Sequence, residues 1–340
     1  MKELPQLSGP GLRGIYSIMW PRLPRTVALT IVIGSAVAAA WCGGSPASPT
    51  PSVAVTPGPG EAPPVNGSPV ETAPAPLPTN PGSTWINIFG DTGWCGSPGM
   101  RPVARMLAEL GGDVFLAGDL AYDNGTIEEF QRCFDPDFGR FKSRSWAAPG
   151  NHDYQTPNAN GYFNYFGDRA GPNRLGYYAV RSSAWKVLML NSNVPIGRGT
   201  AQLEFVRQEL QRDPARCTLA VMHHPFDSSG PNGPSPALRD LWELMYDAGV
   251  DLVVAGHDHL YERHAPMDAS LKADPVRGIR LLIAGTGGAA LYGTARAAVN
   301  SEFRVSVYGL LRLHLEPALY EWEFRDQNGA IRDNGLNICH

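Results

Sequence analysis

The chain has 340 residues, of which 43% are hydrophobic, and a formal net charge of −4 at pH 7. This length allows a substantial core, in one large domain or two small ones. Because the charge is spread along the chain without a basic block, the composition argues against nucleic acid as an obligate partner.

Residues 1–42 are predicted to form an export signal. Two arginines precede an apolar run from Thr26 to Ala40, and small residues suited to cleavage end that run. Met19 is an alternative start, since the residues before it do not resemble an export signal. We therefore expect a secreted, extracytoplasmic protein, in the periplasm or at the cell surface. An uncleaved signal that tethers the chain to the membrane is the second interpretation, and a lipid anchor at Cys42 is the third.

Residues 43–83 are rich in proline, alanine and serine and contain few large apolar residues. Such a segment cannot bury enough surface to offset the loss of chain entropy, so we predict a disordered linker. From residue 84 to residue 340 the sequence is globular in character, has no internal repeat and fits a single domain.

The globular part contains four cysteines, an even number that suits an oxidising compartment. Four cysteines allow three pairings. We favour Cys95 with Cys133, because the loop that holds the first and the helix that holds the second should be neighbours. Buried free thiols are the alternative.

Strands and helices alternate as far as residue 259, and the chain becomes rich in strands after Gly278. Helices are predicted at 98–112, 127–141, 201–213 and 236–249. Segments with a strand are predicted at 85–91, 113–119, 146–153, 175–181, 185–193, 217–225, 251–259, 279–288, 303–315 and 319–329. The alternation implies a mainly parallel sheet, and the terminal strands imply a second, antiparallel set.

Five of these strands end in polar residues that suit a metal or phosphate site. In an open α/β sheet, ligands gather at the carboxyl ends of the strands. A single Gly-Asp turn or solvated His pair would be unremarkable, but the joint set of carboxylate, phenol, amide and imidazole groups suits divalent and trivalent ions. The candidate residues are Asp91, Asp119, Tyr122, Asn151, His152, His223, His224, His257 and His259.

In order and spacing, the stretches FGDTG, GDLAY, PGNHDY, VMHHP and GHDHLYER resemble the signature of the calcineurin-like metallophosphoesterase superfamily. The tyrosine of GDLAY and the GHDHLYER block make the chain similar to the purple acid phosphatase branch. The resemblance covers the whole globular part, which would be the catalytic domain, 84–340. It implies an α/β fold, α+β in some schemes: a four-layer αββα sandwich of two mixed β-sheets.

The resemblance also implies two metal ions that share Asp119. One ion, Fe(III), would be held by Asp91, Asp119, Tyr122 and His259. The second, a divalent Fe, Zn or Mn ion, would be held by Asp119, Asn151, His223 and His257. In the family the ligand histidine lies two residues before a proline, which selects His223, whereas counting from Val221 would select His224. On an extended segment, His257 and His259 would point the same way, with Asp258 facing elsewhere.

The function implied is a dinuclear metallophosphatase, acid phosphatase-like, in which a metal-bound hydroxide attacks a small phosphomonoester. His152 is the candidate for protonating the leaving oxygen, and His224 is a weaker candidate to assist. One alternative is a phosphodiesterase or nucleotidase, or a phospholipid-headgroup hydrolase, with a divalent metal pair. A second alternative is a non-catalytic, exported protein that binds phosphate or a partner. The sequence indicates no oligomeric state.

Three further expectations concern the surroundings of the site. Asn232 is the nearest polar residue where relatives often offer a further histidine to the phosphate. The GTGG stretch at 285–288 is expected to be a tight turn near the site, because no helix with a lysine follows it. Trp185, Trp242 and Trp322 are expected in the core.

Overall fold

The computed structural model describes residues 77–78, 84–294 and 296–340. The predicted export signal, 1–42, lies outside the described residues, as does the predicted linker, 43–83, apart from Leu77–Pro78. Those two residues form β1, which pairs in parallel with β5 (Tyr178–Ser182). Within the described part of the chain, no helix combines the length and apolar character needed to cross a membrane.

The first sheet has eight strands in the order β1-β5-β6-β7-β8-β10-β9-β11. Neighbours among β6, β7, β8 and β10 pair in parallel, whereas β5, β9 and β11 each pair antiparallel with β6, β10 and β9. The remaining bounds are β6 (Trp185–Met189), β7 (Thr218–Val221), β8 (Leu252–Ala255), β9 (Tyr261–His264), β10 (Arg280–Ala284) and β11 (Ser301–Val305).

The second sheet has six strands in the order β14-β13-β12-β2-β3-β4. Strands β2, β3 and β4 are parallel, and β12, β13 and β14 form an antiparallel set that joins them at β2. The bounds are β2 (Trp85–Phe89), β3 (Asp113–Ala117), β4 (Ser145–Ala148), β12 (Gly309–Leu315), β13 (Leu319–Asp326) and β14 (Ile331–Ile338). Both sheets are therefore mixed, as predicted.

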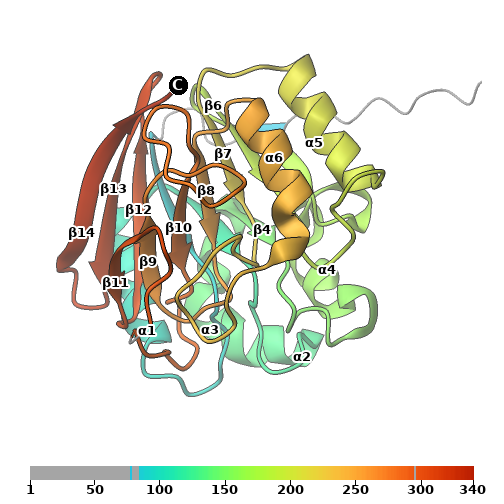
Figure 1. Cartoon of the computed structure of the whole chain (residues 1–340). Coiled ribbons are helices and arrows are strands. Elements are labelled where there is room, and N and C mark those ends of the chain that lie inside the picture. Colours follow the sequence, from blue (N-terminus) through green and yellow to red (C-terminus); the bar gives the residue numbers. More distant parts are fainter. Residues whose placement is uncertain (1–76, 79–83, 295) are drawn as a thin grey trace, which may run out of the picture. The chain divides into compact units, whose positions relative to one another are not determined.

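Three apolar clusters divide the domain into four layers (Figure 1). Residues such as Ile88 and Val187 fill the space between the two sheets. Helices α1 (Met100–Leu110), α3 (Asp135–Phe138) and α4 (Asn160–Phe166) pack on the outer face of the six-stranded sheet. Helices α5 (Ala201–Arg212) and α6 (Arg239–Asp247) cover the eight-stranded sheet. The predicted αββα sandwich is confirmed.

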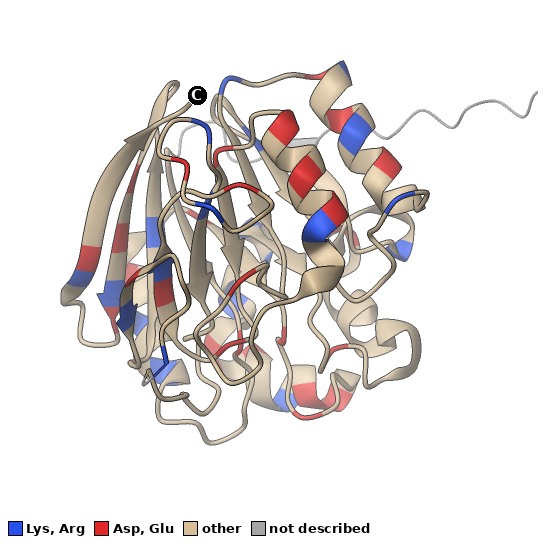
Figure 2. Cartoon of the chain, in the orientation of Figure 1, with Lys and Arg blue, Asp and Glu red and all other residues tan. Residues whose placement is uncertain are grey.

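The three tryptophans assigned to the core are buried: Trp185, Trp242 and Trp322 are 0%, 1% and 4% exposed. Basic and acidic residues both occur along α5, α6 and the strands, as the colours of the cartoon in Figure 2 show, in keeping with the small net charge.

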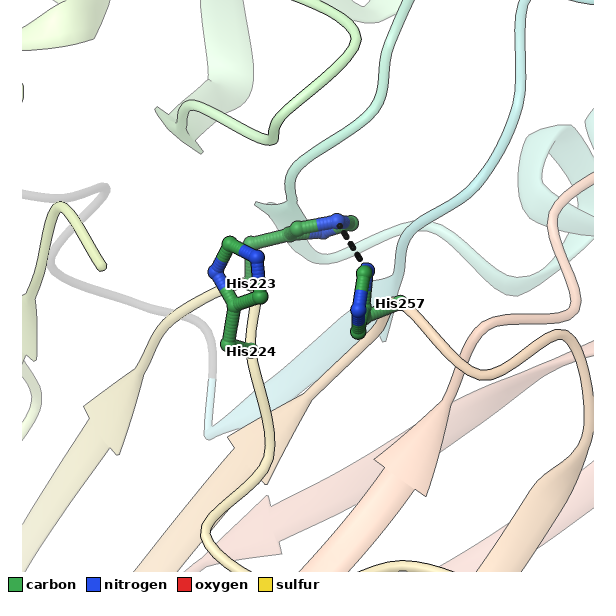
Figure 3. A group of neighbouring side chains, drawn as sticks. All are labelled: His223, His224 and His257. Carbon is green, nitrogen blue, oxygen red and sulfur yellow. Dashed lines mark hydrogen bonds between the residues drawn. The ribbon is translucent and has the colours of Figure 1, made fainter. Parts of the chain in front are cut away.

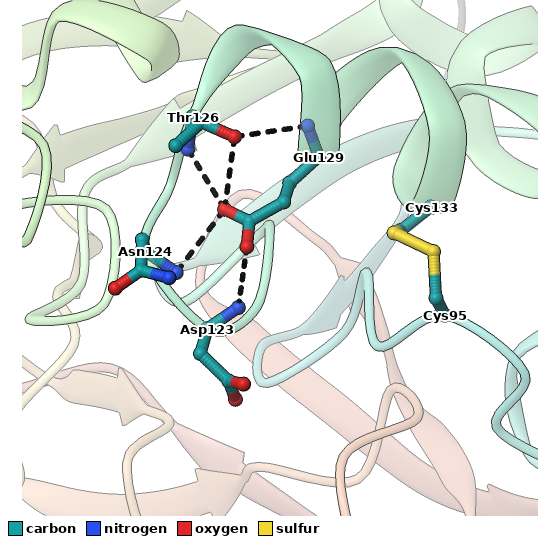
Figure 4. Close-up of a disulfide and its surroundings, with 6 residues drawn as sticks. All are labelled: Cys95, Asp123, Asn124, Thr126, Glu129 and Cys133. Atoms are coloured by element: carbon teal, nitrogen blue, oxygen red, sulfur yellow. Dashed lines mark hydrogen bonds between the residues drawn. A yellow bond between two sulfur atoms is a disulfide. The ribbon is translucent and has the colours of Figure 1, made fainter.

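The helix predicted at 127–141 is divided into short pieces. Helix α2 (Ile127–Glu129) leads through a π-helical turn, Phe130–Phe134, into α3, and a 3₁₀ turn, Gly139–Arg144, follows. The α2 start is a capping box, in which the Thr126 hydroxyl accepts from Glu129 N–H at 3.1 Å. The Glu129 carboxylate also accepts from Asp123 N–H and Asn124 N–H (Figure 4). It thereby anchors the loop that follows Tyr122.

Two disulfides connect distant parts of the domain. Cys95 is bonded to Cys133 of the π-helical turn, with the Cα atoms 4.6 Å apart, which confirms the predicted pair (Figure 4). Cys217 is bonded to Cys339, with the Cα atoms 5.5 Å apart. The four cysteines of the globular part are therefore all paired, and the alternative of buried free thiols is wrong.

Candidate metal centre

The predicted site residues follow five strands that end on the same side of the sandwich. Asp91 follows β2, Asp119 follows β3, and Asn151 follows β4 of the six-stranded sheet. His223 follows β7 and His257 follows β8 of the eight-stranded sheet. Their contacts fall into two groups that meet at Asp119.

The first group surrounds the Tyr122 hydroxyl. The Tyr122 Oη lies 3.2 Å from Asp91 Oδ1, 3.2 Å from Asp119 Oδ2 and 3.1 Å from His259 Nε2. His259 Nε2 is also 3.3 Å from Asp91 Oδ1. These four residues are the set expected to hold the first ion.

The second group surrounds His223 Nε2. This atom lies 3.2 Å from Asp119 Oδ2, 3.0 Å from Asn151 Oδ1 and 3.1 Å from His257 Nδ1 (Figure 3). These four residues are the set expected to hold the second ion. Asp119 Oδ2 contacts both groups, which is the position that a shared ligand requires.

Two backbone carbonyls set the orientation of the imidazole rings. His223 Nδ1 is 2.9 Å from Ala117 O, and His259 Nδ1 is 2.7 Å from Ala290 O. A carbonyl oxygen only accepts, so each Nδ1 carries a proton and each Nε2 faces the centre, where it can bind a metal ion once it has no proton. Such outer contacts commonly orient histidine ligands in metal sites.

The loops at the strand ends approach each other very closely. Asp91, Asp119 and His257 have positive φ angles of 57°, 53° and 72°, in the left-handed region that non-glycine residues rarely adopt. A Cβ atom on Gly150 would lie 2.1 Å from Asp119 Oδ1, and one on Gly256 would lie 2.5 Å from Asp91 Oδ2. Gly150 and Gly256, which precede Asn151 and His257, therefore have no room for a side chain.

The expected extended geometry of the His257–His259 segment is wrong. The segment forms bends between β8 and β9, and the positive φ of His257 breaks the alternation of a strand. The two histidines nevertheless face different groups of the centre. Asp258 does face elsewhere, because its carboxylate accepts from Ser228 Oγ and from Asn232 N–H.

Burial and charge attract protons or cations to the centre. Asp91 and Asp119 are 0% and 1% exposed. Burial would raise the pKa of Asp119, but His223 and His152 outweigh it and hold that pKa below its usual range. Burial acts in the opposite direction on His223 and would lower its pKa, but Asp119 and Asp91 raise that pKa to about 9. In Tyr122, burial together with Asp91 and Asp119 raises the phenol pKa well above 10.

His224 lies at the edge of the centre. Its Nδ1 is 2.8 Å from Ser192 Oγ, and its ring centroid is 4.4 Å from that of His257 (Figure 3). Burial and the neighbouring His223 and His257 lower the pKa of His224 to about 3, so the ring is neutral. The structure thus brings His223, rather than His224, into contact with Asp119 and Asn151.

His152 contacts the centre through its backbone and its ring. Its N–H donates to Asp119 Oδ1 at 2.8 Å, and its Nδ1 donates to Asp123 O at 2.6 Å. The ring Nε2 therefore faces Asp119 Oδ2, at 4.0 Å. Asn232 lies close by but donates its amide to His257 O at 2.9 Å.

Two supporting residues were not identified as such from the sequence. The buried Asp153 carboxylate accepts from the N–H groups of Asp119, Leu120 and Gly150. Tyr292 stacks on His259, with ring centroids 4.2 Å apart and an angle of 11° between the planes. Asp153 lies inside the PGNHDY motif but was not among the expected site residues, and nothing in the sequence around Tyr292 indicated its contact.

The GTGG stretch lies against the first motif loop, near the site as expected, although it forms a bend and not a hydrogen-bonded turn. Gly287 N–H donates to Gly90 O at 2.9 Å, and Ala289 N–H donates to Asp91 O at 2.8 Å.

The donor set fits a pair of metal ions. Two buried carboxylates, a phenol, an amide oxygen and inward-facing imidazole nitrogens are the groups that hard and borderline ions bind. Buried carboxylates require compensating positive charge. In the protein without ions, His223 supplies part of this positive charge, because its raised pKa keeps the ring protonated.

The family model of the calcineurin-like phosphoesterases matches residues 84–261, and the chain belongs to this family. Membership implies two metal ions. Purple acid phosphatase 21 of Arabidopsis thaliana is 30% identical over 251 residues, which are 65% of this chain and 56% of that protein. Probable purple acid phosphatase 20 of the same plant is 27% identical over 255 residues, 66% of this chain and 58% of that protein.

These relatives confirm the resemblance to the purple acid phosphatase branch, although the chain spans less than two thirds of their length. Solved structures agree on the fold. Purple acid phosphatase PPD1 from yellow lupin (Lupinus luteus) has a TM-score of 0.65 at 22% identity, over 74% of this chain and 53% of that one. GAP50, the anchor in the inner membrane complex of Plasmodium, has a TM-score of 0.57 at 16% identity, over 75% of this chain and 89% of that one.

Proposed function

We propose that this protein is a secreted, dinuclear metallophosphatase that hydrolyses phosphomonoesters. The observation that supports it most strongly is the position of Asp119 Oδ2, which is 3.2 Å from both Tyr122 Oη and His223 Nε2. A carboxylate between two complete donor groups suits a pair of adjacent ions, and such pairs serve phosphoester hydrolysis.

Each ion has its own set of protein ligands in this proposal. Fe(III) is assigned to Asp91, Asp119, Tyr122 and His259, because a phenolate stabilises the trivalent state. A divalent Fe, Zn or Mn ion is assigned to Asp119, Asn151, His223 and His257. When bound, the ions would hold the phosphate, acidify a water molecule and offset the negative charge on the transferred group.

The remaining residues would handle the leaving group and the phosphate oxygens. The bond from His152 Nδ1 to Asp123 O holds the ring so that Nε2 faces the centre. A proton on Nε2 would pass to the alcohol oxygen as the phosphorus–oxygen bond breaks. The neutral His224, fixed by Ser192, would donate a hydrogen bond to the phosphate rather than act as the main acid.

Metal analysis and activity assays on one preparation test the proposal. We expect two metal ions for each chain, a visible absorption band from iron–phenolate, and faster hydrolysis of monoesters than of diesters. Asp119→Ala should abolish activity and lower the metal content, whereas Asp137→Ala, a change at an ion pair away from the centre, should leave both unchanged.

The outcomes separate the alternatives. Full activity in Asp119→Ala would exclude the shared ligand. A colourless dinuclear site would exclude the iron–phenolate assignment alone. A preference for diesters would favour the phosphodiesterase, and a metal-replete protein inert to both substrates would favour a binding protein.

Secretion is supported by the two disulfides, which persist in oxidising compartments. N-terminal sequencing of protein from the exported fraction should find a chain that begins just after Ala40. A chain that retains the apolar run from Thr26 would favour the tethered form instead.

A further inference from the structure

An apolar groove lies beside the metal centre, and His224 is one of its lining residues. Its volume is about 420 Å³. One wall is the loop 192–200, after β6, and the other is His224 with the segment 235–238. The apolar side chains that line it are Val194, Pro195, Ile196, Ala237 and Leu238.

The groove and the metal centre share the ring of His224. That ring lies 4.4 Å from His257 and 5.0 Å from His223, measured between centroids. Ser192, another lining residue, forms a hydrogen bond with His224 through its hydroxyl. The groove is therefore within reach of the alcohol portion of an ester whose phosphate lies at the metal centre.

The walls of the groove are preformed. Ile196 and Leu238 are only 4% and 3% exposed, because both pack in the cluster beneath α5 and α6. The 235–238 segment is held by hydrogen bonds from Ser235 N–H to Pro225 O, at 3.2 Å, and from Leu238 N–H to Ser235 O, at 3.0 Å. A ligand would not have to order these walls, so its apolar contacts would contribute directly to binding.

The lining selects an apolar alcohol over a polar one. None of the described residues that line the groove is Asp, Glu, Lys or Arg. The Ser192 hydroxyl is already bonded to His224, and the Thr200 hydroxyl donates to Gly197 O at 2.8 Å. A sugar or glycerol portion would lose hydration with few partners in return.

We infer that the preferred substrates are phosphomonoesters of apolar alcohols, whose hydrocarbon part occupies this groove. The inference rests on the proposed phosphatase function and specifies its substrate class. Each methylene that the groove buries should improve recognition by about two- to fourfold, until the chain extends past the groove.

The test uses the full chain, loaded with metal, and straight-chain alkyl phosphates from methyl to octyl. We expect kcat/KM to rise with chain length by about two- to fourfold for each methylene and then to level off. Val194→Asn and Ala237→Asn should flatten this rise and leave kcat/KM for methyl phosphate within about twofold of the wild-type value. Val194 is half-buried and Ala237 is exposed, so neither change opens the core.

Ala273→Asn provides the matched control. Ala273 is exposed in the connection from β9 to β10, at the far end of the sheet from the strand ends that carry the site. The Ala273→Asn variant should keep the rise of kcat/KM with chain length. A wild-type series that is flat, or a rise that survives in both groove variants, would overturn the inference.

Calorimetry with methyl- and octylphosphonate separates this inference from the proposed function. These compounds resist hydrolysis, so their affinities report the groove even in an inactive protein. Tighter binding of octylphosphonate, reduced in Ala237→Asn, supports the groove. If methyl- and octylphosphonate bind equally well while methyl phosphate is hydrolysed, the role of the groove is refuted and the phosphatase function stands. If no ester is hydrolysed, the phosphatase function is refuted, and with it the assigned substrate class.

Discussion

Replacing Asp153 with alanine should weaken the fold and the metal centre together. The carboxylate is fully buried and accepts from the backbone N–H groups of Asp119 at 3.1 Å, Leu120 at 3.2 Å and Gly150 at 2.8 Å. These bonds join the loop after β3 to the loop after β4. Alanine would leave three buried N–H groups without their acceptor.

The size of the effect follows from these bonds. Loss of one hydrogen bond to a charged group costs about 1.5–3 kcal/mol. Neighbouring bonds do not add fully, so we expect Asp153→Ala to lower the free energy of unfolding by about 3–5 kcal/mol. Urea unfolding of both proteins measures this difference. Because Asp119 is one of the three donors, metal affinity should also fall about 10–100-fold in competition with a chelator.

The control is Asp137→Ala, in which the lost partner is Arg101 at 3.6 Å. The Arg101 side chain is 79% exposed, so the free energy of unfolding should change by no more than about 0.5 kcal/mol. If Asp153→Ala is as stable as this control and binds metal as tightly as the wild type, the three hydrogen bonds do not hold the loops together.

Three other changes have defined outcomes. Cys95→Ser with Cys133→Ser should lower the free energy of unfolding by about 4 kcal/mol in urea, since the bridge closes a sequence separation of 38; an unchanged midpoint would contradict this. Tyr122→Phe should remove the visible band of the metal-loaded protein while circular dichroism stays native, and a variant that keeps its colour would refute the iron–phenolate assignment. In the metal-free protein, burial and Asp119 raise the pKa of Asp153 from 3.8 to about 7. The folded state then binds this proton more tightly than the unfolded chain, so the part of the stability that comes from this proton is complete below about pH 4 and is lost as the pH rises through about 7. The difference in unfolding free energy between the wild type and Asp153→Asn should shrink over that interval, and a constant difference would count against the shift.

Much of the centre was predictable because its residues follow strands. A buried parallel strand delivers its next residues to the carboxyl edge of the sheet, whatever path the connecting helix takes. This is why Asp91 and Asp119, 28 positions apart in the printed sequence, could be assigned to one site. The alternation of helices and strands predicted only a mainly parallel sheet and a second, antiparallel set, whereas the αββα layers were expected from the resemblance to the family.

The loop conformations were not predictable in the same way. The His257–His259 segment was expected to be extended, yet it bends, because β8 ends at Ala255 and His257 adopts a positive φ. The single helix expected at 127–141 is interrupted by a π-helical turn. Both segments are bound to distant residues: His257 N–H donates to Asp91 Oδ2, and Cys133 is joined to Cys95.

The sequence by itself determined which donor groups this protein has and on which strand ends they lie, because residue type and periodicity are local properties of the chain. Only the tertiary structure decided which atoms of those groups meet. The carbonyls of Ala117 and Ala290, distant in sequence from His223 and His259, take up Nδ1 of each ring and leave Nε2 for the centre. The groove at His224 likewise depends on two loops from different parts of the chain packing side by side, which no local pattern specifies.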